Sequence, residues 1–555
     1  MSAPLPPSPA NPYCAPGEEV TYAPDLFGQG SVPHVMEGVP TWMAALGLGF
    51  VILGSHLLVG LKKDDDPTRP PAPTRKANAP PSLRHLLRAC GARLRDADLL
   101  RLRPLKNLVL RPGFPLLAQS GSLLLFLLVL GAGLFGPSHG QLATVVTWTW
   151  WWALLVFFVA GLGNAFCAVC PWEALASLVS SLSFSSRRKR LGYELPWPRP
   201  LRNLYPALAL FLLLTWLELG LDVTHSGRAT ASLGAGMAFL AVFCALVFER
   251  RAFCRHACLV GRVSGIYSLF SPVELRPKSI DACASCPTKD CHRGNASSTG
   301  CPTHLFPGAL RENTYCVSCS ECIRACPHDN FALRLRPPAA DLFAKKRFLL
   351  DESVFALFLL ALTSFHGLTM TADWPWWNYR LRLLTGFGPN LVFSLLMLLS
   401  LVLPLLLFLL GARCSRRLGG NQVSTGRIFK VFACSILPVA LFYHLAHNAM
   451  HFFMEAARIL PVLGDPFALG WNLFGLAAHL PAPLLSLETV WWIQLVLIVA
   501  GHLYGVLVAD RLARRLFPEP RLALRALAPL ILVMILYSAF SLWLIATPME
   551  MRSAM

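Results

Sequence analysis

The chain has 555 residues, of which 55% are hydrophobic and 14% are charged, and it carries a formal net charge of +19 at pH 7. Soluble domains carry about 25% charged residues, so this composition excludes an ordinary soluble protein. The excess of Lys and Arg does not indicate a nucleic-acid partner, because these residues lie in the connections between long apolar segments. We therefore expect an all-α polytopic membrane protein.

Stretches of about 20 apolar residues recur along the chain, and a helix of that length crosses a bilayer. They predict about ten transmembrane helices, in two sets on either side of a cysteine-rich stretch. The expected ranges are 41–61, 115–136, 142–167, 205–222, 232–249, 350–371, 388–411, 428–453, 488–509 and 525–547.

The connections between these helices alternate in charge. Lys and Arg are absent from residues 1–40 and are concentrated in 62–112, 187–190, 413–427 and 511–525. Since cytoplasmic loops of membrane proteins collect positive charge, we expect both termini outside and the cysteine-rich stretch in the cytoplasm. Several tryptophans then fall at the outer interface as an aromatic belt: Trp42, Trp148, Trp374, Trp376, Trp377, Trp491 and Trp492.

The N-terminal third contains two segments without a span. Residues 1–40 are rich in Pro and Gly, which predicts an irregular outer segment before the first transmembrane helix at 41–61. Residues 62–112 are a basic cytoplasmic linker. Within it, leucines and arginines alternate at helical spacing over 82–103, which indicates an amphipathic helix on the membrane surface.

Two cysteine pairs lie at inner helix ends of the four-helix membrane region, 113–270. Cys167 and Cys170 end the third helix, and Cys254 and Cys258 follow the fifth. The helical spacing places both thiols of a pair on one face. Together the pairs could hold a third [4Fe–4S] cluster, form redox-active dithiols or pack as small residues. Nearby basic residues favour the cluster, because cations stabilise thiolates.

Residues 271–346 contain the strongest motif, Cys316-x-x-Cys319-x-x-Cys322-x-x-x-Cys326-Pro327. This is the bacterial ferredoxin run, in which three thiolates hold one [4Fe–4S] cluster and the fourth reaches a second cluster. Thiolates also bind zinc, but the closing Cys-Pro favours iron and sulfur. We therefore expect a small cytoplasmic ferredoxin-like insert with two [4Fe–4S] clusters.

A second, stretched cysteine run precedes the first, with a zinc knuckle as its alternative. Because the fourth cysteine of each run serves the other cluster, the two sets are expected to exchange one ligand. Cluster one is then held by Cys283, Cys286, Cys291 and Cys326, and cluster two by Cys316, Cys319, Cys322 and Cys301.

The five-helix C-terminal membrane region, 347–555, contains histidines inside its predicted spans. Ionisable residues within a membrane are functional candidates. On a helix, His447 and His451 share a face. The histidines could hold a b-type haem, bind copper or another metal, serve a quinol site, or hydrogen-bond between helices. The candidates are His366, His444, His447, His451 and His502.

Glu218 is a further acid near the outer end of the fourth predicted helix. It could accept a proton from a quinol, but its position near the end of the helix favours a place at the membrane interface. We therefore expect it to lie at the interface.

The paired cysteines at inner helix ends, followed by the Cys316–Cys326 run, make residues 115–340 resemble the membrane polyferredoxin family, which includes NapH, NosR and CcoG. The resemblance implies a bacterial inner-membrane protein with periplasmic termini. It also implies electron transfer between the quinone pool or a cytoplasmic donor and a periplasmic or membrane redox partner, within a multisubunit complex. The five C-terminal helices are an extension beyond the family pattern.

Three functions are compatible with these motifs and with the resemblance. The first is an electron-transfer subunit of an oxidoreductase system. The second is an assembly factor that reduces or delivers a metal for a respiratory oxidase or reductase. The third is a redox-sensing regulator, whose clusters sense the redox state instead of passing electrons to a partner.

Overall fold

The computed structural model describes residues 34–60, 97–111, 113–136, 142–182, 191–479 and 481–551. Most of the predicted outer segment 1–40 and most of the predicted surface helix 82–103 lie outside the described residues. The described residues are 73% helical. This confirms the all-α polytopic class.

Nine helical stretches of the described residues are long and apolar enough to cross a membrane. They are α1 (Thr41–Gly60), α4 (Gly113–Phe135), α5 to α6 (Leu142–Leu162), α9 (Gly227–Val247), α16 (Leu350–Thr369), α18 (Pro389–Leu418), α19 to α21 (Thr425–Gly464), α22 (Leu487–Leu516) and α23 (Pro520–Ala546). The remaining predicted span, 205–222, forms the apolar helix α8 (Tyr205–Gly220), which is shorter than the others.

Local sequence signals set several helix starts. Ser226 and Ser486 cap α9 and α22, because each side chain accepts a hydrogen bond from an amide of the first turn. Proline occupies the first turn of α8, α18 and α23, where its missing amide hydrogen costs nothing. These signals explain why the predicted ranges agree closely with the helices.

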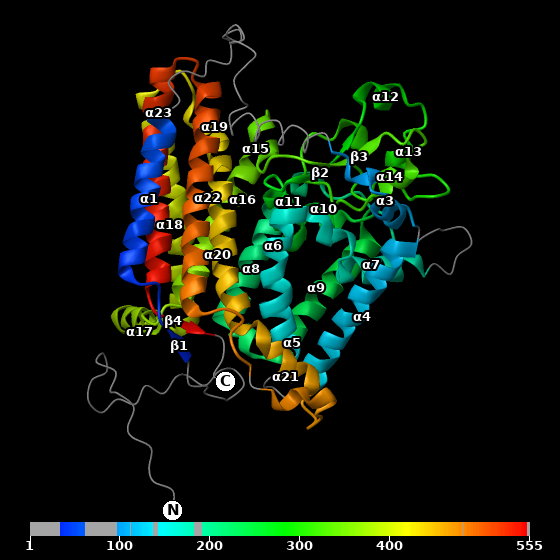
Figure 1. Ribbon diagram of the computed structural model, residues 1–555, viewed down its shortest axis with the longest axis horizontal. Coiled ribbons are helices and arrows are strands. Elements are labelled where there is room, and N and C mark those ends of the chain that lie inside the picture. The colour runs from blue at the N-terminus through cyan, green and yellow to red at the C-terminus, as the bar shows by residue number, and fades with distance from the viewer. Residues whose placement is uncertain are drawn as a thin grey trace, which may run out of the picture.

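The first helix packs with the last ones rather than with its neighbours in sequence. Figure 1 shows α1 beside α22 and α23, while α4, α6, α8 and α9 form the other side of the molecule. Helices α16 and α20 lie between these two sets, since α16 contacts α8 and α20 contacts α6. The sequence order alone does not indicate this pairing of α1 with the C-terminal helices.

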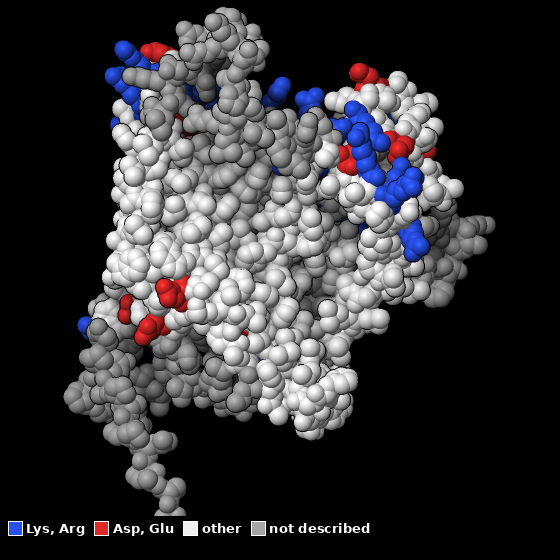
Figure 2. Space-filling view, viewed as in Figure 1, with Lys and Arg blue, Asp and Glu red and all other residues white. Residues whose placement is uncertain are grey.

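Both ends of the described chain lie at the same end of the helical bundle. Strand β1 (His34–Met36) pairs antiparallel with β4 (Met549–Met551). The segment 271–346, here called the cysteine-rich segment, lies at the opposite end (Figure 1). Most of the visible Lys and Arg side chains gather at that end too (Figure 2).

The cysteine-rich segment is built on a short antiparallel pair of strands, β2 (Val273–Pro277) and β3 (Phe331–Leu335). Four short helices surround the pair: α12 (Ile280–Ser285), α13 (Asp290–Arg293), α14 (Glu321–Ala325) and α15 (Ala340–Ala344). The segment packs closely on the membrane helices. A Cβ atom at Gly265, on α11 (Leu259–Tyr267), would lie only 2.3 Å from the carbonyl oxygen of Thr314.

The end of the basic linker packs against this segment. Leu102 is extended, and helix α3 (Arg103–Leu110) begins just after it, with Pro104 in its first turn. The described part of the predicted surface helix, 97–103, contains the 3-10 turn η1 (Leu99–Arg101) and the first residue of α3. Asp98 accepts a hydrogen bond from the amide of Leu333 at 3.1 Å, which fixes the linker to the edge of β3.

Candidate metal centres

Twelve of the fifteen cysteines in the described residues gather in three groups of four, and each name below is kept throughout. Group one consists of Cys283, Cys286, Cys291 and Cys326, which line one small cavity. Group two consists of Cys301, Cys316, Cys319 and Cys322, which line a second small cavity. Group three consists of Cys167, Cys170, Cys254 and Cys258, whose thiols influence one another electrostatically.

Group one is organised by Asn330, just before β3. Its side-chain amide donates to the Cys283 Sγ at 3.2 Å, and its backbone amide donates to the Cys326 Sγ at 3.4 Å. The Cys286 thiol is more open, and the backbone amide of Lys289 lowers its pKa. Burial raises the pKa of the Cys291 thiol to about 11. Amide donors of this kind stabilise thiolate ligands.

Group two is formed by a tight loop that leads into α14. Ser318 and Ser320 both have positive φ, 49° and 64°, so the backbone turns sharply between the cysteines. Burial raises the pKa of the Cys316 and Cys319 thiols, while the amides of Ser318 and Glu321 oppose that rise. Helix α14 carries Cys322 of group two and is followed by Cys326 of group one, so it links the two groups.

Group three lies where the membrane helices meet the cysteine-rich segment. Cys170 and Cys258 are the N-terminal caps of α7 (Pro171–Ser181) and α11, while Cys254 lies on α10 (Ala252–His256). Cys167, Cys170 and Cys258 are all buried. A Cβ atom at Gly261 would lie 3.7 Å from the Cys167 Sγ and 3.8 Å from the Cys258 Sγ, so the cysteine pairs from distant helices meet here.

The three groups lie in a row with group two in the middle. Cys322 of group two is close enough to Cys291 of group one to influence its charge state. On the other side, the buried Arg251 interacts with both Cys254 of group three and Cys319 of group two. The predicted sets therefore become neighbours in space, in the order one, two, three.

Buried cations accompany the groups. Arg251 Nε donates to the Glu173 carboxylate at 2.8 Å, and Glu173 also accepts from the Cys254 Sγ at 3.4 Å. Arg276, near Cys316, is held by the Asn313 side chain at 2.9 Å and by a carboxylate of the cysteine-rich segment. The basic residues near Cys254 were visible in the sequence, whereas the roles of Arg276 and Asn330 depend on packing.

Throughout the described ranges, no three His, Cys, Asp or Glu side chains converge closely enough to hold a single metal ion. A [4Fe–4S] cube is larger than one ion, and its four thiolate ligands are correspondingly farther apart. Each of the three groups is therefore a candidate cage for one [4Fe–4S] cluster.

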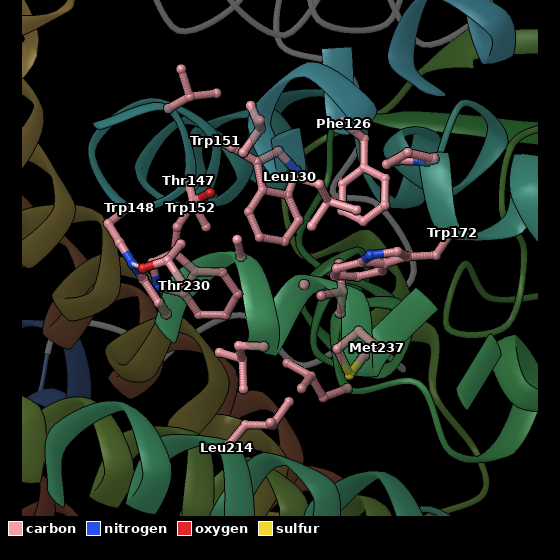
Figure 3. A pocket seen from close by; sticks show the side chains of 18 of the residues that line it. Phe126, Leu130, Thr147, Trp148, Trp151, Trp152, Trp172, Leu214, Thr230 and Met237 are labelled. Carbon is pink, nitrogen blue, oxygen red and sulfur yellow. Dashed lines mark hydrogen bonds between the residues drawn. The ribbon is translucent and has the colours of Figure 1, made fainter. Parts of the chain in front are cut away.

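A cavity of about 210 Å³ lies in the membrane region beside group three. Figure 3 shows Trp151, Trp172 and Phe126 around it, with Trp148 on another side. Trp148 Nε1 donates to the Thr230 Oγ1 at 2.9 Å. Residues next to the group three cysteines also line the cavity: Phe166, Pro171, Trp172, Leu259 and Val260.

Two expectations about this region were wrong. Trp148 was assigned to the outer aromatic belt, but it is 6% exposed, lines the cavity and is hydrogen-bonded to Thr230 of α9. Glu218 was expected at the interface, but it is buried and also lines the cavity. The tryptophans Trp42, Trp376 and Trp377 are exposed, as a belt requires.

The predicted histidines do not form one site. The rings of His366 and His447 have centroids 4.8 Å apart, those of His447 and His451 are 4.9 Å apart, and His451 Nδ1 lies 3.6 Å from the Glu455 carboxylate. We call these three histidines the histidine row.

The other two predicted histidines lie elsewhere. His444 contacts the hydroxyl of Tyr267 at 3.4 Å. His502 bridges Ser55 and Ser538, at 2.8 Å to each. His502 therefore links α1, α22 and α23 through hydrogen bonds. Hydrogen bonding between helices was one of the roles predicted for these histidines.

The fold and these groups define a multi-pass helical membrane protein with three four-thiol groups. Over 240 residues the chain is 27% identical to "Putative electron transport protein YccM" of Escherichia coli (strain K12). The match covers 38% of this chain and 61% of the relative, so it spans less than two thirds of that protein. The similarity supports an electron-transport membrane family and a role in electron transfer. Neither protein-family comparison nor comparison with solved structures gives a match.

Proposed function

We propose that the protein carries electrons through three [4Fe–4S] clusters, one in each thiol group, as in the polyferredoxin proteins that the sequence resembles. The observation that carries this proposal is the row of three four-thiol groups. Three adjacent clusters provide a path for electrons, whereas zinc does not change its oxidation state and provides none. The protein supplies spacing and burial, and the cluster supplies the redox chemistry.

The residues present fit such clusters. Four thiolates and a cube carry net negative charge. Arg251 and Arg276 lie near groups two and three but are paired with Glu173 and Asp341, whereas the buried Arg262 beside group three has no such pair among the described residues. A buried charge is tolerated when an opposite charge lies nearby. Group one is open to its surroundings at Cys286 and instead receives amide hydrogen bonds from Asn330.

We propose that the quinone pool exchanges electrons with group three through the aromatic cavity. A quinone has a flat, mostly apolar ring with polar oxygens, and the cavity offers tryptophan faces with a carboxyl group, Glu218, in its lining. Quinol oxidation releases two electrons and two protons. The two electrons pass one at a time to the clusters. Glu218 accepts one proton, and the second proton is released to water. The cysteine-flanking residues of the lining bring the ring close to group three.

The sidedness of this path follows from charge. The cysteine-rich segment lies at the basic end of the molecule, opposite the end where β1 pairs with β4. We propose that this basic end faces the cytoplasm of a bacterium and that both termini face the periplasm. A periplasmic or membrane redox protein, within a multisubunit complex, then completes the system.

The direct test is iron, labile sulfide and EPR analysis of the full-length protein purified without oxygen. Three clusters require about twelve iron atoms per chain, at four per cube. About eight iron atoms would remove group three from the proposal. Zinc in place of iron and sulfide would overturn it.

The histidine row supports a second metal site. Two axial imidazoles of one haem lie on opposite faces of its plane, whereas the His366 and His447 rings are already in contact. By contrast, two imidazoles on one ion have ring centres about 5 Å apart, for metal–nitrogen bonds of about 2.0–2.1 Å. We therefore propose a transition-metal ion, with copper as the first candidate, rather than a b-type haem. Binding requires ring rotation, since no three side chains of the described chain converge yet.

Replacing His447 by alanine is expected to remove this ion, because His447 is the middle member of the row. Metal analysis should then show a loss of about one ion per chain with iron unchanged, since one site is lost and the thiol groups are distant. His479→Ala, outside the bundle, is the matched control. Wild-type protein without a non-iron metal, or with haem absorbance, would contradict the assignment.

A bound ion in the histidine row would favour the second function, an assembly factor that reduces or delivers a metal. That function uses the same electron path but ends it on the ion instead of on a partner protein. The two functions differ in whether the ion leaves the protein when the clusters are reduced.

A further inference from the structure

Arg262 is a buried arginine that forms no ion pair with an acidic side chain of the described residues. It lies on α11, four residues after Cys258, and is only 1% exposed. Within the part of the chain that the structure describes, its Nε and Nη1 atoms have no hydrogen-bond partner. Burying a guanidinium whose hydrogen-bond donors have no partner costs free energy. A nearby anion that is not supplied by a carboxylate of the chain would lower that cost.

The packing around Arg262 holds it in this position. Its guanidinium carbon lies 5.1 Å from the centre of the Tyr315 ring, a cation–π contact. One turn further along α11, Gly265 is pressed against the carbonyl oxygen of Thr314, which leaves no space for the helix to shift. Tyr315 is followed directly by Cys316 of group two, so Arg262 lies at the junction between groups two and three.

The other buried arginines near the thiol groups differ from Arg262. Arg251 is neutralised by Glu173, and Arg276 by Asp341. Arg262 instead lies one turn after Cys258 on α11, and its backbone amide donates to the Cys258 carbonyl oxygen at 3.0 Å. The preceding residue, Gly261, lies against the Cys167 and Cys258 Sγ atoms. Burial raises the pKa of both thiols, and the positive charge of Arg262 opposes that rise. The thiols of group three are therefore potential anions close to Arg262.

We propose that Arg262 is a positioning residue that balances the charge of the metal centre in group three and raises its reduction potential. This inference rests on the proposed function, because it requires a cluster in that group. Reduction adds one electron to the cluster and neither makes nor breaks a bond. The added negative charge is stabilised by the fixed guanidinium, and net charge is one of the factors that set cluster potentials.

The experiment is a potentiometric EPR titration of anaerobically purified full-length protein, with dithionite as the reductant. In Arg262→Gln, the midpoint potential of the group three cluster is expected to shift to a more negative value, by more than that of its neighbour in group two, while the group one potential stays unchanged. Arg262→Lys keeps the charge and should return that potential toward the wild-type value. Arg293→Gln, which removes an exposed arginine beside group one, should leave the group three potential unchanged because solvent screens it.

The outcomes separate this inference from the proposed function. An unchanged set of three potentials in Arg262→Gln overturns the role of Arg262 and leaves the three clusters intact. Loss of about four iron atoms in Arg262→Gln but not in Arg262→Lys supports the role, because charge alone then decides whether the cluster is held. Equal loss in both variants overturns it. Wild-type protein with only two clusters refutes the third cluster itself.

Discussion

Replacing Cys322 by alanine is expected to stop electron transfer between group three and group one. Cys322 belongs to group two, which lies between the other groups. Removing one of its four thiols should lower the iron content from about twelve to about eight atoms per chain. In full-length protein treated with a reduced short-chain quinol, the group one EPR signal should then stay absent, while the group three signal still develops.

Cys434→Ala is the matched control for this prediction. Cys434 is also a buried cysteine, 2% exposed, but it lies between α19 (Thr425–Ala433) and α20 (Leu437–Glu455), away from the three groups. This variant should keep all the iron and the full group one signal. Rapid reduction of group one in Cys322→Ala would mean that electrons bypass group two, and the linear path would be wrong.

Replacing Glu218 by glutamine should slow quinol-dependent reduction of the clusters by about 100-fold, the lower end of what a positioned proton acceptor contributes. Glutamine keeps the size of the side chain, so the cavity and the packing of α8 should be preserved. Reduction by dithionite, which needs no proton acceptor in the membrane, should proceed at the wild-type rate. Stopped-flow absorbance of the clusters with each reductant measures both.

Glu488→Gln provides the control, because Glu488 is an exposed acid at the start of α22. Its rates with both reductants should match the wild type. Equal rates for Glu218→Gln and wild-type protein with the quinol would exclude Glu218 as the proton acceptor. Slow reduction by both reductants would instead indicate damage to the clusters.

Much of the architecture was predictable because the signals are local. A transmembrane helix requires an unbroken apolar stretch, and the ten predicted segments all form apolar helices. Cysteine spacing is equally local, so the sets that the ferredoxin pattern assigned to two clusters are the sets that line two cavities. The exchange of Cys301 and Cys326 between them follows the same rule.

Other features depend on contacts between distant segments, and the sequence misassigned several of them. The sequence around Trp148 indicates an interfacial tryptophan, since its neighbours are aromatic and it lies near a helix end, but the side chain is buried and hydrogen-bonded to Thr230 of α9. The sequence marks five histidines within the C-terminal spans as candidate ligands. In the structure only three of them make a row, because the orientation of α16 toward α20 decides which rings meet.

The sequence by itself determined the membrane class, the positions of the spans and the membership of the thiol groups, because apolar length and cysteine spacing act over a few residues. Only the tertiary structure decided that the groups stand in a row, that α1 joins the C-terminal helices and that Glu218 and Trp148 enclose a cavity. It also decided that Arg262 is buried beside group three. These properties arise from the packing of helices far apart in the chain, which no local pattern encodes.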